Sequence, residues 1–457
     1  MSIASELTNL RTNISNAYDA INTKGGTIPA NKNTANLATA IDSVPSGGGD
    51  IVNGIIANFK ATSSTIDANT FVEFINNITA GTDTQLSTVS NSYTYASAAA
   101  LSPDKVFIAH YGANTYLYGV ICTISGTTIT VGTETQLSTI QNSYQYSSVA
   151  VLDIDKVFIA HRGSSYLYGV VCTISDTTIT VGSDTRLSTV PNSFAYASAV
   201  ALDTDKVFIA HANENYLHGL VCTISGTAIA TGTDTKLSTY SSSHYYASTV
   251  KLDTDKVFIA SGNNYLYGVV CTISGTDITA GAVKDISTYS SVSAYNSVVV
   301  LDPNRVFIKM NINQCLYGVV CTIDGTTITV GDQTQLSAVT SAYYYASAVL
   351  VDTDKVFIAH TAGDYLYGTV CTISGISITL DVDMQLSTVQ NSYQYVSAVA
   401  FGTDKIFIAH RNGDFLYGMV CNSTGTVLAA TKKWAIQGLT KTECTTTMAG
   451  EVWMLNP

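Results

Sequence analysis

The chain has 457 residues, a formal net charge of -12 and only 12% charged residues, about half the usual fraction. With 46% hydrophobic residues it can bury a large core, so wholesale disorder is excluded. No run of Lys and Arg suits a polyanion and no segment reaches the roughly 20 apolar residues that span a bilayer, so we expect neither nucleic-acid binding nor membrane insertion.

The first 49 residues are predicted to be a helical attachment and oligomerisation segment. The opening MSIASELTNL lacks the basic and apolar regions of a secretory signal, so synthesis in the cytoplasm is expected. Apolar residues then recur at spacings of four and three, typical of a coiled-coil seam or of an amphipathic helix packed on its own chain. The pattern leaves both open, and its members are Ile3, Leu7, Leu10, Ile14, Ala17 and Ile21. A second short helix and a Gly-rich linker at 45–49 follow.

Both ends of the chain are predicted to contribute strands to a small β platform. Residues 50–76 form its N-terminal part and residues 426–457 complete it. Between them, residues 77–425 are expected to form one repeat domain. Residues 77–87 resemble the last strand of a repeat and can close a ring from the N-terminal side. A strand at 426–436 is the alternative closure.

The repeat predicts a mainly β fold, a seven-bladed β-propeller. Seven VFIA-like segments recur at spacings of 49 to 51 residues, each centred on a phenylalanine: Phe107, Phe158, Phe208, Phe258, Phe307, Phe357 and Phe407. Each unit has four short apolar segments separated by turns: a (SAVAL), b (VFIAH), c (YLYGVVCTI) and d (TITVG to QLST). Four strands in each of seven units match propeller blades, and an open β-solenoid is the alternative.

Seven of the nine cysteines follow the same period, which favours buried apolar packing over disulfides. They are Cys122, Cys172, Cys222, Cys271, Cys321, Cys371 and Cys421, with Cys315 and Cys444 left over.

The chain direction assigns two different faces to the propeller. The a–b and c–d turns share a constant face, where turns such as Asp153-Ile154-Asp155-Lys156 hardly change between repeats. The b–c and d–a connections share a variable face, where the loops differ in every repeat. Recognition usually resides in variable loops on a rigid scaffold, so the variable face is the candidate ligand-binding surface.

Aromatic and polar residues of that face are the candidate ligand-binding set. An invariant tyrosine precedes strand a in each repeat and is more simply explained by packing between blades: Tyr95, Tyr146, Tyr196, Tyr246, Tyr295, Tyr345 and Tyr395. A second, less regular aromatic residue suits a sugar ring better. The candidates are Tyr93, Tyr144, Phe194, Tyr245, Tyr343 and Tyr393, with loop residues Asn114, Arg162, Glu214, Asn263, Asp364, Arg411 and Asp414.

No residue set predicts catalysis, a cofactor or a metal. Five repeats end strand b in histidine (His110, His161, His211, His360 and His410), replaced by Ser261 and Lys309 in the others. Histidines on separate blades are too far apart to share a zinc ion, so a repeated structural hydrogen bond is expected. The Asp-x-Asp turns lack the remaining positions of a calcium loop. The fifth repeat departs most, at Lys309, Met310, Asn311 and Cys315, which indicates either a specialised pocket or drift.

The two ends also carry a resemblance. The heptad helix, the segment TIPANKNTANLATAIDSV, the FVEF strand and the C-terminal GLTKTECTTTMAGEVWML resemble end modules of tail-fibre and baseplate-associated proteins of tailed phages of Gram-positive bacteria. The resemblance implies a virion tail protein, often trimeric, that binds other tail or baseplate proteins through its N-terminal segment.

Together these features predict a non-enzymatic receptor-binding protein of the virion tail. Its variable propeller face would contact a host-surface glycan or protein. A propeller enzyme that degrades cell-wall glycans and a structural tail component without a receptor role are the alternatives.

Overall fold

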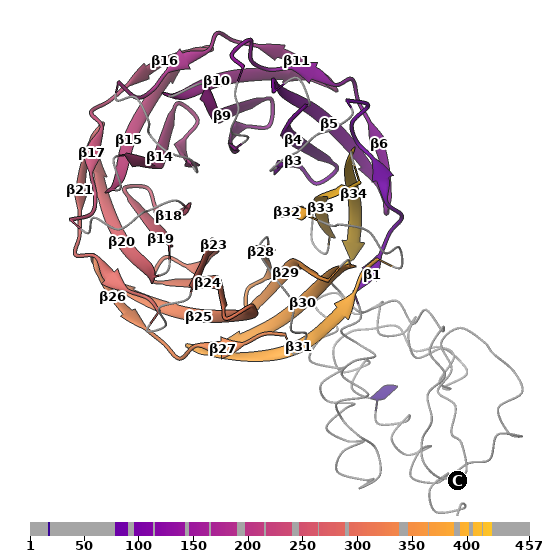
Figure 1. Cartoon of the computed structure of the whole chain (residues 1–457), viewed down its shortest axis with the longest axis vertical. Helices are drawn as coiled ribbons and strands as arrows, with labels where there is room; N and C mark the ends of the chain where they lie inside the picture. The colour runs from indigo at the N-terminus through magenta and orange to yellow at the C-terminus, as the bar shows by residue number, and fades with distance from the viewer. Residues whose placement is uncertain are drawn as a thin grey trace, which may run out of the picture. The chain divides into compact units, whose positions relative to one another are not determined.

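The repeats fold as seven β-sheets arranged in a ring in the computed structural model (Figure 1). The structure describes residues 17–18, 78–89, 96–112, 115–141, 146–163, 166–189, 197–213, 216–239, 246–263, 265–287, 292–337, 346–363, 365–387, 394–401, 405–413 and 415–422. The chain divides into two compact units, residues 78–423 and the two ends, 1–77 with 424–457. The propeller is the first unit.

Blade 2 illustrates the repeated sheet. Its strands β8 (Ser147–Asp153), β9 (Lys156–Gly163), β10 (Tyr166–Ser175) and β11 (Thr178–Val181) pair antiparallel in sequence order, and β12 (Thr185–Arg186) also pairs with β10. These are the predicted strands a to d, with d divided in two. Strand a lies nearest the centre of the ring and strand d at its circumference (Figure 1).

The other blades repeat this order. Blade 1 has β3 (Ser97–Ser102), β4 (Lys105–Tyr111), β5 (Leu117–Ser125), β6 (Thr128–Val131) and β7 (Thr135–Gln136). Blade 3 has β13 (Ser198–Asp203), β14 (Lys206–Asn213), β15 (Tyr216–Ser225), β16 (Ala228–Thr231) and β17 (Thr235–Lys236). Blade 4 has β18 (Tyr246–Asp253), β19 (Lys256–Asn263), β20 (Tyr265–Ser274), β21 (Asp277–Ala280) and β22 (Lys284–Asp285).

The second half of the ring varies slightly. Blade 5 has β23 (Val292–Asp302), β24 (Arg305–Ile312), β25 (Cys315–Asp324), β26 (Thr327–Val330) and β27 (Thr334–Gln335). Blade 6 has β28 (Ala346–Asp352), β29 (Lys355–Ala362), β30 (Tyr365–Ser374) and one continuous strand d, β31 (Ser377–Gln385). Blade 7 has β32 (Gln394–Phe401), β33 (Lys405–Asn412) and β34 (Phe415–Asn422).

The N-terminal segment closes the ring. Strands β1 (Thr79–Ala80) and β2 (Thr84–Gln85) pair antiparallel with β34, and Thr79 lies opposite Asn422. Closure by residues 77–87 is therefore confirmed, and the alternative at 426–436 is wrong, because β1 already occupies that edge of β34. The first and last described residues of the propeller meet at the constant face.

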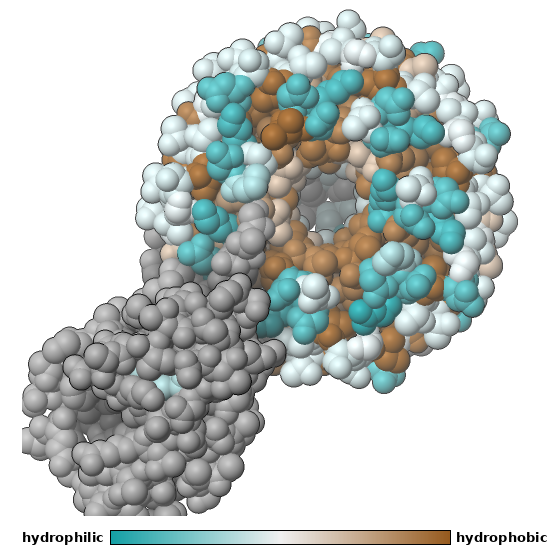
Figure 2. Space-filling view, turned by 180° about the vertical axis from the view of Figure 1, so that it is seen from behind, coloured by the Kyte–Doolittle hydropathy of each residue, from teal (hydrophilic) through white to brown (hydrophobic). Residues whose placement is uncertain are grey.

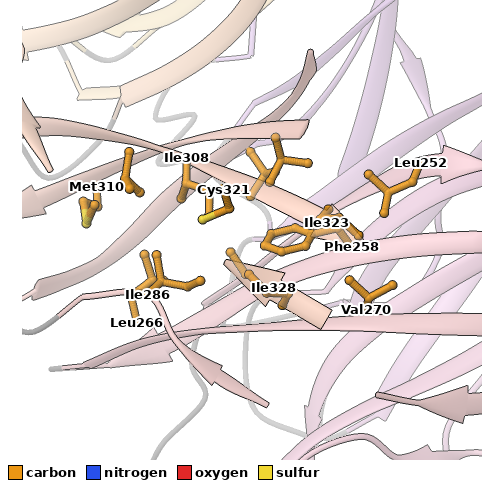
Figure 3. Packing of buried hydrophobic residues seen from close by; sticks show 14 of the residues in the cluster. Leu252, Phe258, Leu266, Val270, Ile286, Ile308, Met310, Cys321, Ile323 and Ile328 are labelled. Atoms are coloured by element: carbon orange, nitrogen blue, oxygen red, sulfur yellow. The ribbon is translucent and has the colours of Figure 1, made fainter. Parts of the chain in front are cut away.

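The core consists of apolar layers between neighbouring blades. Between blades 4 and 5, Phe258 and Leu266 of blade 4 pack against Ile308 and Met310 of blade 5 (Figure 3). Because each sheet is covered on both faces, strands b and c are apolar almost without interruption. The glycine of each YLYG segment makes room for the phenylalanine of strand b: a Cβ at Gly169 would lie 2.9 Å from the Phe158 ring.

The cysteines belong to these layers, as predicted. The seven repeated thiols are free and buried, and burial raises the pKa of Cys271, for example, to about 12. Nearer the axis, strand a is less buried, and Figure 2 shows apolar residues bordering a central opening.

The constant face is built from tight hairpin turns, as expected. Five of the c–d turns place their glycine in the left-handed conformation, as at Gly126, whose φ is 62°. Asp176 adopts a φ of 56° at this position in blade 2, and its carboxylate pairs with Lys105 of blade 1 at 2.9 Å. In the a–b turn, Ile154 N donates to the Asp153 carboxylate.

The predicted N-terminal helices and β platform lie outside the described residues, with one exception. Ala17 of the predicted seam is helical and buried, as is its neighbour Tyr18. Within the described part of the chain, no helix is long and apolar enough to cross a membrane.

Candidate functional site

A row of polar side chains crosses five blades just beneath the variable face. The histidine that ends strand b donates a hydrogen bond to an acid at the start of the outer d strand, as His161 Nε2 does to Asp184 Oδ1 at 2.8 Å. His211–Asp234, His360–Asp383 and His410–Asp83 are bonded in the same way, and His110 Nε2 lies 2.8 Å from Glu134 Oε1. All five histidines are buried. The expected structural role of these histidines is confirmed.

The same acids connect neighbouring blades. Ser138 of blade 1 donates to Asp184 of blade 2 at 2.9 Å, and Ser337 of blade 5 donates to Asp383 of blade 6 at 2.6 Å. Burial alone would raise the pKa of Asp383, but its hydrogen bonds, chiefly from His360 and Ser337, outweigh burial and hold the pKa below its usual range. Asp383 is therefore a charged structural link between blades 5 and 6.

The strand register corrects the sequence alignment of the fifth repeat. Met310 lies opposite Tyr317, as His161 lies opposite Tyr168, so Met310 and not Lys309 replaces the histidine. The two repeats without the histidine also lack the acid. In blade 4 the histidine and acid positions are occupied by Ser261 and Val283, and in blade 5 by Met310 and Gln333. Histidine and acid are lost together because neither is satisfied alone beneath the face.

Lys309 instead occupies the position of an alanine in the other six blades. It is fully buried on the side of β24 that faces blade 6, and its Nζ donates to Tyr295 O at 3.0 Å. Burial lowers the pKa of Lys309 to about 7. The facing blade carries a matching exception, Thr369, where the others have Val, Leu or Met; Thr369 is bonded to His360 and Asp383. The departure of the fifth repeat thus forms a buried polar cluster.

Closer to the solvent, the residue at or just before the start of strand c lies at the outer rim of the variable face, and it is aromatic in six of the seven blades. Each ring lies two residues before the position that stacks on the histidine, so both point to the same side of the sheet. The rim residues are Tyr116, Tyr166, Tyr216, Tyr265, Cys315, Tyr365 and Phe415. All are at least partly exposed, and Tyr265 is the most exposed of the described aromatic residues, at 46%.

The side chain beside each rim residue differs between blades. It belongs to the outer d strand, at Gln85, Gln136, Arg186, Lys236, Asp285, Gln335 and Gln385. Each glutamine is fixed by its amide nitrogen, as in Gln136 Nε2 to Ser138 O at 2.9 Å. In blades 2 and 3 a cation lies over the ring instead: Arg186 Cζ is 4.9 Å from the centroid of Tyr166, and Lys236 Nζ is 3.1 Å from that of Tyr216.

Three of the predicted ligand-binding residues fall within the described chain. Arg162 lies in strand β9 rather than in a loop and is buried, Asn263 is the last residue of β19, and Arg411 in β33 donates from Nε to Gly413 O at 2.8 Å. The other ten lie outside the described residues: Tyr93, Asn114, Tyr144, Phe194, Glu214, Tyr245, Tyr343, Asp364, Tyr393 and Asp414.

The invariant tyrosines behave as packing residues where two neighbours are described. Tyr246 of blade 4 and Tyr295 of blade 5 meet across the blades, with ring centroids 4.1 Å apart and a hydroxyl-to-hydroxyl bond of 2.7 Å. The predicted packing between blades is observed for this pair.

Sequence reasoning missed the rim pairs. Their signal is present in the repeat, because the first Tyr of YLYG and the first letter of QLST can each be aligned across the blades. At the latter position Arg186, Lys236 and Asp285 stand out against four glutamines. Within the described residues, no group of three or more His, Cys, Asp and Glu side chains could hold a metal ion.

Comparisons with known proteins agree on the fold. No protein-family model matches the chain, and no curated protein matches it either. The β-propeller domain of Myceliophteria thermophila Cps50 (Swd1) is similar over 75% of this chain and 99% of its own, at 9% identity and a TM-score of 0.50. This likeness supports the propeller and nothing further, because the identity is so low.

Two structures with lower TM-scores are those of a sialidase and of a lectin. The NanB sialidase of Streptococcus pneumoniae aligns over 77% of this chain and 71% of its own, at 12% identity and a TM-score of 0.44. The fucose-specific lectin of Aleuria aurantia aligns over 61% and 95%, at 15% identity and a TM-score of 0.39.

Proposed function

We propose that this chain is a non-enzymatic carbohydrate-binding propeller that attaches a phage tail to the host cell surface through its variable face. The outer rim carries the proposal. Partly exposed tyrosine rings stand beside polar side chains that change from blade to blade, on sheets held rigid by their neighbours. Aromatic faces suit the apolar side of a sugar ring, and amide or charged groups suit its hydroxyl rim.

A binding role without turnover is proposed from the chemistry of the acids. Glycoside hydrolysis ordinarily uses two carboxyl groups about 5 to 10 Å apart, one of them free to transfer a proton. The described acids of the histidine rows are bonded to histidine, and some also to serine, as Asp184 is. The exposed acid of the rim, Asp285, stands on blade 4, where the row has no acid. Analysis of host polysaccharide for released fragments tests this: sustained product formation would contradict it.

The rim is tested with the full-length protein on a glycan array and on host cells. A triple variant, Tyr116→Ala, Tyr265→Ala and Tyr365→Ala, should lose at least tenfold in affinity, since aromatic contacts contribute about 1 kcal/mol or more each. Ile154→Ser is the matched control, because Ile154 is exposed on the constant face. Equal loss in both proteins, or none in the triple variant, would contradict binding at the rim.

The virion role is proposed from the resemblance of the chain ends to tail-fibre and baseplate modules. Antibodies against the propeller should decorate the distal tail of intact particles in electron microscopy. Labelling buried within the tail or absent from the particle would favour the structural alternative or remove the virion role altogether.

A further inference from the structure

The joint between blades 2 and 3 differs in charge from the other joints within the described residues. Blade 3 presents Lys236 at its rim, and His218 replaces the tyrosine that the other six blades carry at that position of strand c. Blade 2 faces this joint with Arg162, because Arg162 alternates along β9 with Phe158 and Ala160, which pack against blade 3. Three cation-capable side chains therefore converge on one joint.

Each of these three side chains is held in place. The ring of Tyr216 lies beneath Lys236 Nζ at 3.1 Å from its centroid, although Lys236 itself is exposed. A cation over an aromatic face is attracted by the ring, so the ammonium group has less freedom to lose when it binds an anion. His218 is anchored through Nδ1 to Asp234 Oδ1 at 3.0 Å, which leaves Nε2 as its second hydrogen-bonding atom. Arg162 is buried in the strand.

The acid of this joint, Asp234, is already hydrogen-bonded to two histidines. Asp234 accepts hydrogen bonds from both His211 and His218, which outweigh the effect of burial and hold its pKa far below its usual range. Among the described residues of this joint, one carboxylate thus stands against the two cations Arg162 and Lys236, so this part of the joint is positive in a chain whose formal net charge is -12. In the next joint the equivalent positions are Ala212, Tyr267 and Asp285, so the positive charge is local.

We infer that the joint between blades 2 and 3 binds the anionic group, carboxylate or phosphate, of an acidic glycan. The inference rests on the proposed carbohydrate-binding function and names its ligand class. Lys236 and His218 supply donors at the rim, and Arg162 supplies positive charge behind them. Recognition here uses charge, because Lys236 covers the Tyr216 ring, whereas the exposed ring of Tyr265 in blade 4 is available for stacking. Arg186 over Tyr166 places a further cation on the rim of blade 2.

The test compares three probes on the full-length protein: a uronic-acid oligosaccharide, the same oligosaccharide with its carboxyl groups reduced, and a sugar-phosphate polymer. Binding of at least one anionic probe should exceed binding of the neutral one about tenfold or more and should weaken as salt is raised. The two anionic arms tell carboxylate from phosphate.

Residues that occupy the same positions in other blades give substitutions that are compatible with the fold. Lys236→Gln installs the residue of four other blades and His218→Tyr that of six, and each should weaken anionic binding about tenfold. Lys284→Gln removes an exposed cation from blade 4 and should leave binding unchanged. Equal binding of acidic and reduced probes, or anionic binding insensitive to the blade 3 variants, would overturn the inference while leaving carbohydrate binding intact. Failure of every glycan to bind would overturn the proposed function, and the inference with it.

Discussion

At the scale of single residues, Lys309 makes stability depend on pH. Its pKa of about 7 in the folded protein lies below the ordinary value near 10.5, so folding disfavours its proton. The resulting destabilisation is absent above pH 10.5, grows as the pH falls and is complete below pH 7. Lys309→Met keeps the volume without the charge and should raise the free energy of unfolding by about 2 to 4 kcal/mol at pH 7. The gain should shrink toward pH 10 in urea titrations.

The control for Lys309 is the same chemical change at an exposed site. Lys284→Met should alter stability little and with no trend between pH 7 and 10, because an exposed ammonium keeps its hydration. If the curves of Lys309→Met and the parent protein ran parallel over this range, Lys309 would have an ordinary affinity for its proton in the folded state.

The residue scale is also where sequence reasoning reached least far. The histidine rows were predicted as structural bonds from their period alone, but the acid partner could not be named, because a repeat does not tell which side chains share one face. Strand register supplies that information, and it also moves Lys309 away from the histidine position. Arg162 was predicted as a loop residue because its strand runs two residues further than the VFIAH segment. Ten loop candidates remain predictions.

At the scale of elements, seven inter-blade bonds encircle the central opening. The serine two residues after each invariant tyrosine meets the backbone of strand a in the next blade, as in Ala199 N to Ser148 Oγ at 2.9 Å. The other donors and acceptors follow the ring: Val149 to Ser97, Thr249 to Ser198, Val298 to Ser248, Ala348 to Ser297 and Ala98 to Ser397. At the joint of blades 6 and 7, Ser347 donates to Ala398 O at 3.5 Å instead.

This difference predicts unequal effects of the same substitution. Ser148→Ala leaves the amide of Ala199 without this acceptor and should lower the free energy of unfolding by about 1 to 2 kcal/mol. Ser347→Ala removes only a long bond and should cost less, so it is the matched control. Chemical denaturation gives both values, and amide exchange at Ala199 localises the effect. Similar losses in the two variants would mean that the serines contribute by packing alone.

At the scale of the whole molecule, the fold was predictable because it depends on features that repeat. The period, the four apolar segments and the strand at 77–87 predict a ring closed from the N-terminal side, and β1 opposite β34 confirms it. Mutual covering of the blades also explains the low charge of the chain. Attachment and oligomerisation depend on the ends, which occur once, so no internal comparison supports them and they stay predictions.

Closure makes one isoleucine more important than its counterparts. Ile78 precedes β1 and is buried between blades 6 and 7, whereas Ile129 occupies the same position in strand d of blade 1. Replacing either by Ala should cost about 2 to 4 kcal/mol through the lost contacts and the cavity left behind.

Strand β6 can re-pair through its short turn after it frays, but β1 must find β34, more than 300 residues away, and closing so long a loop is entropically unfavourable. Ile78→Ala should therefore also speed amide exchange at Gly81, whose N–H donates to Val420 O, and at the edge of β34, and it should accelerate global unfolding more than Ile129→Ala does. Hydrogen exchange with mass spectrometry and unfolding kinetics measure both effects, and equal unfolding rates with no local change at Gly81 would show that the seam of the ring is no weaker than any other joint.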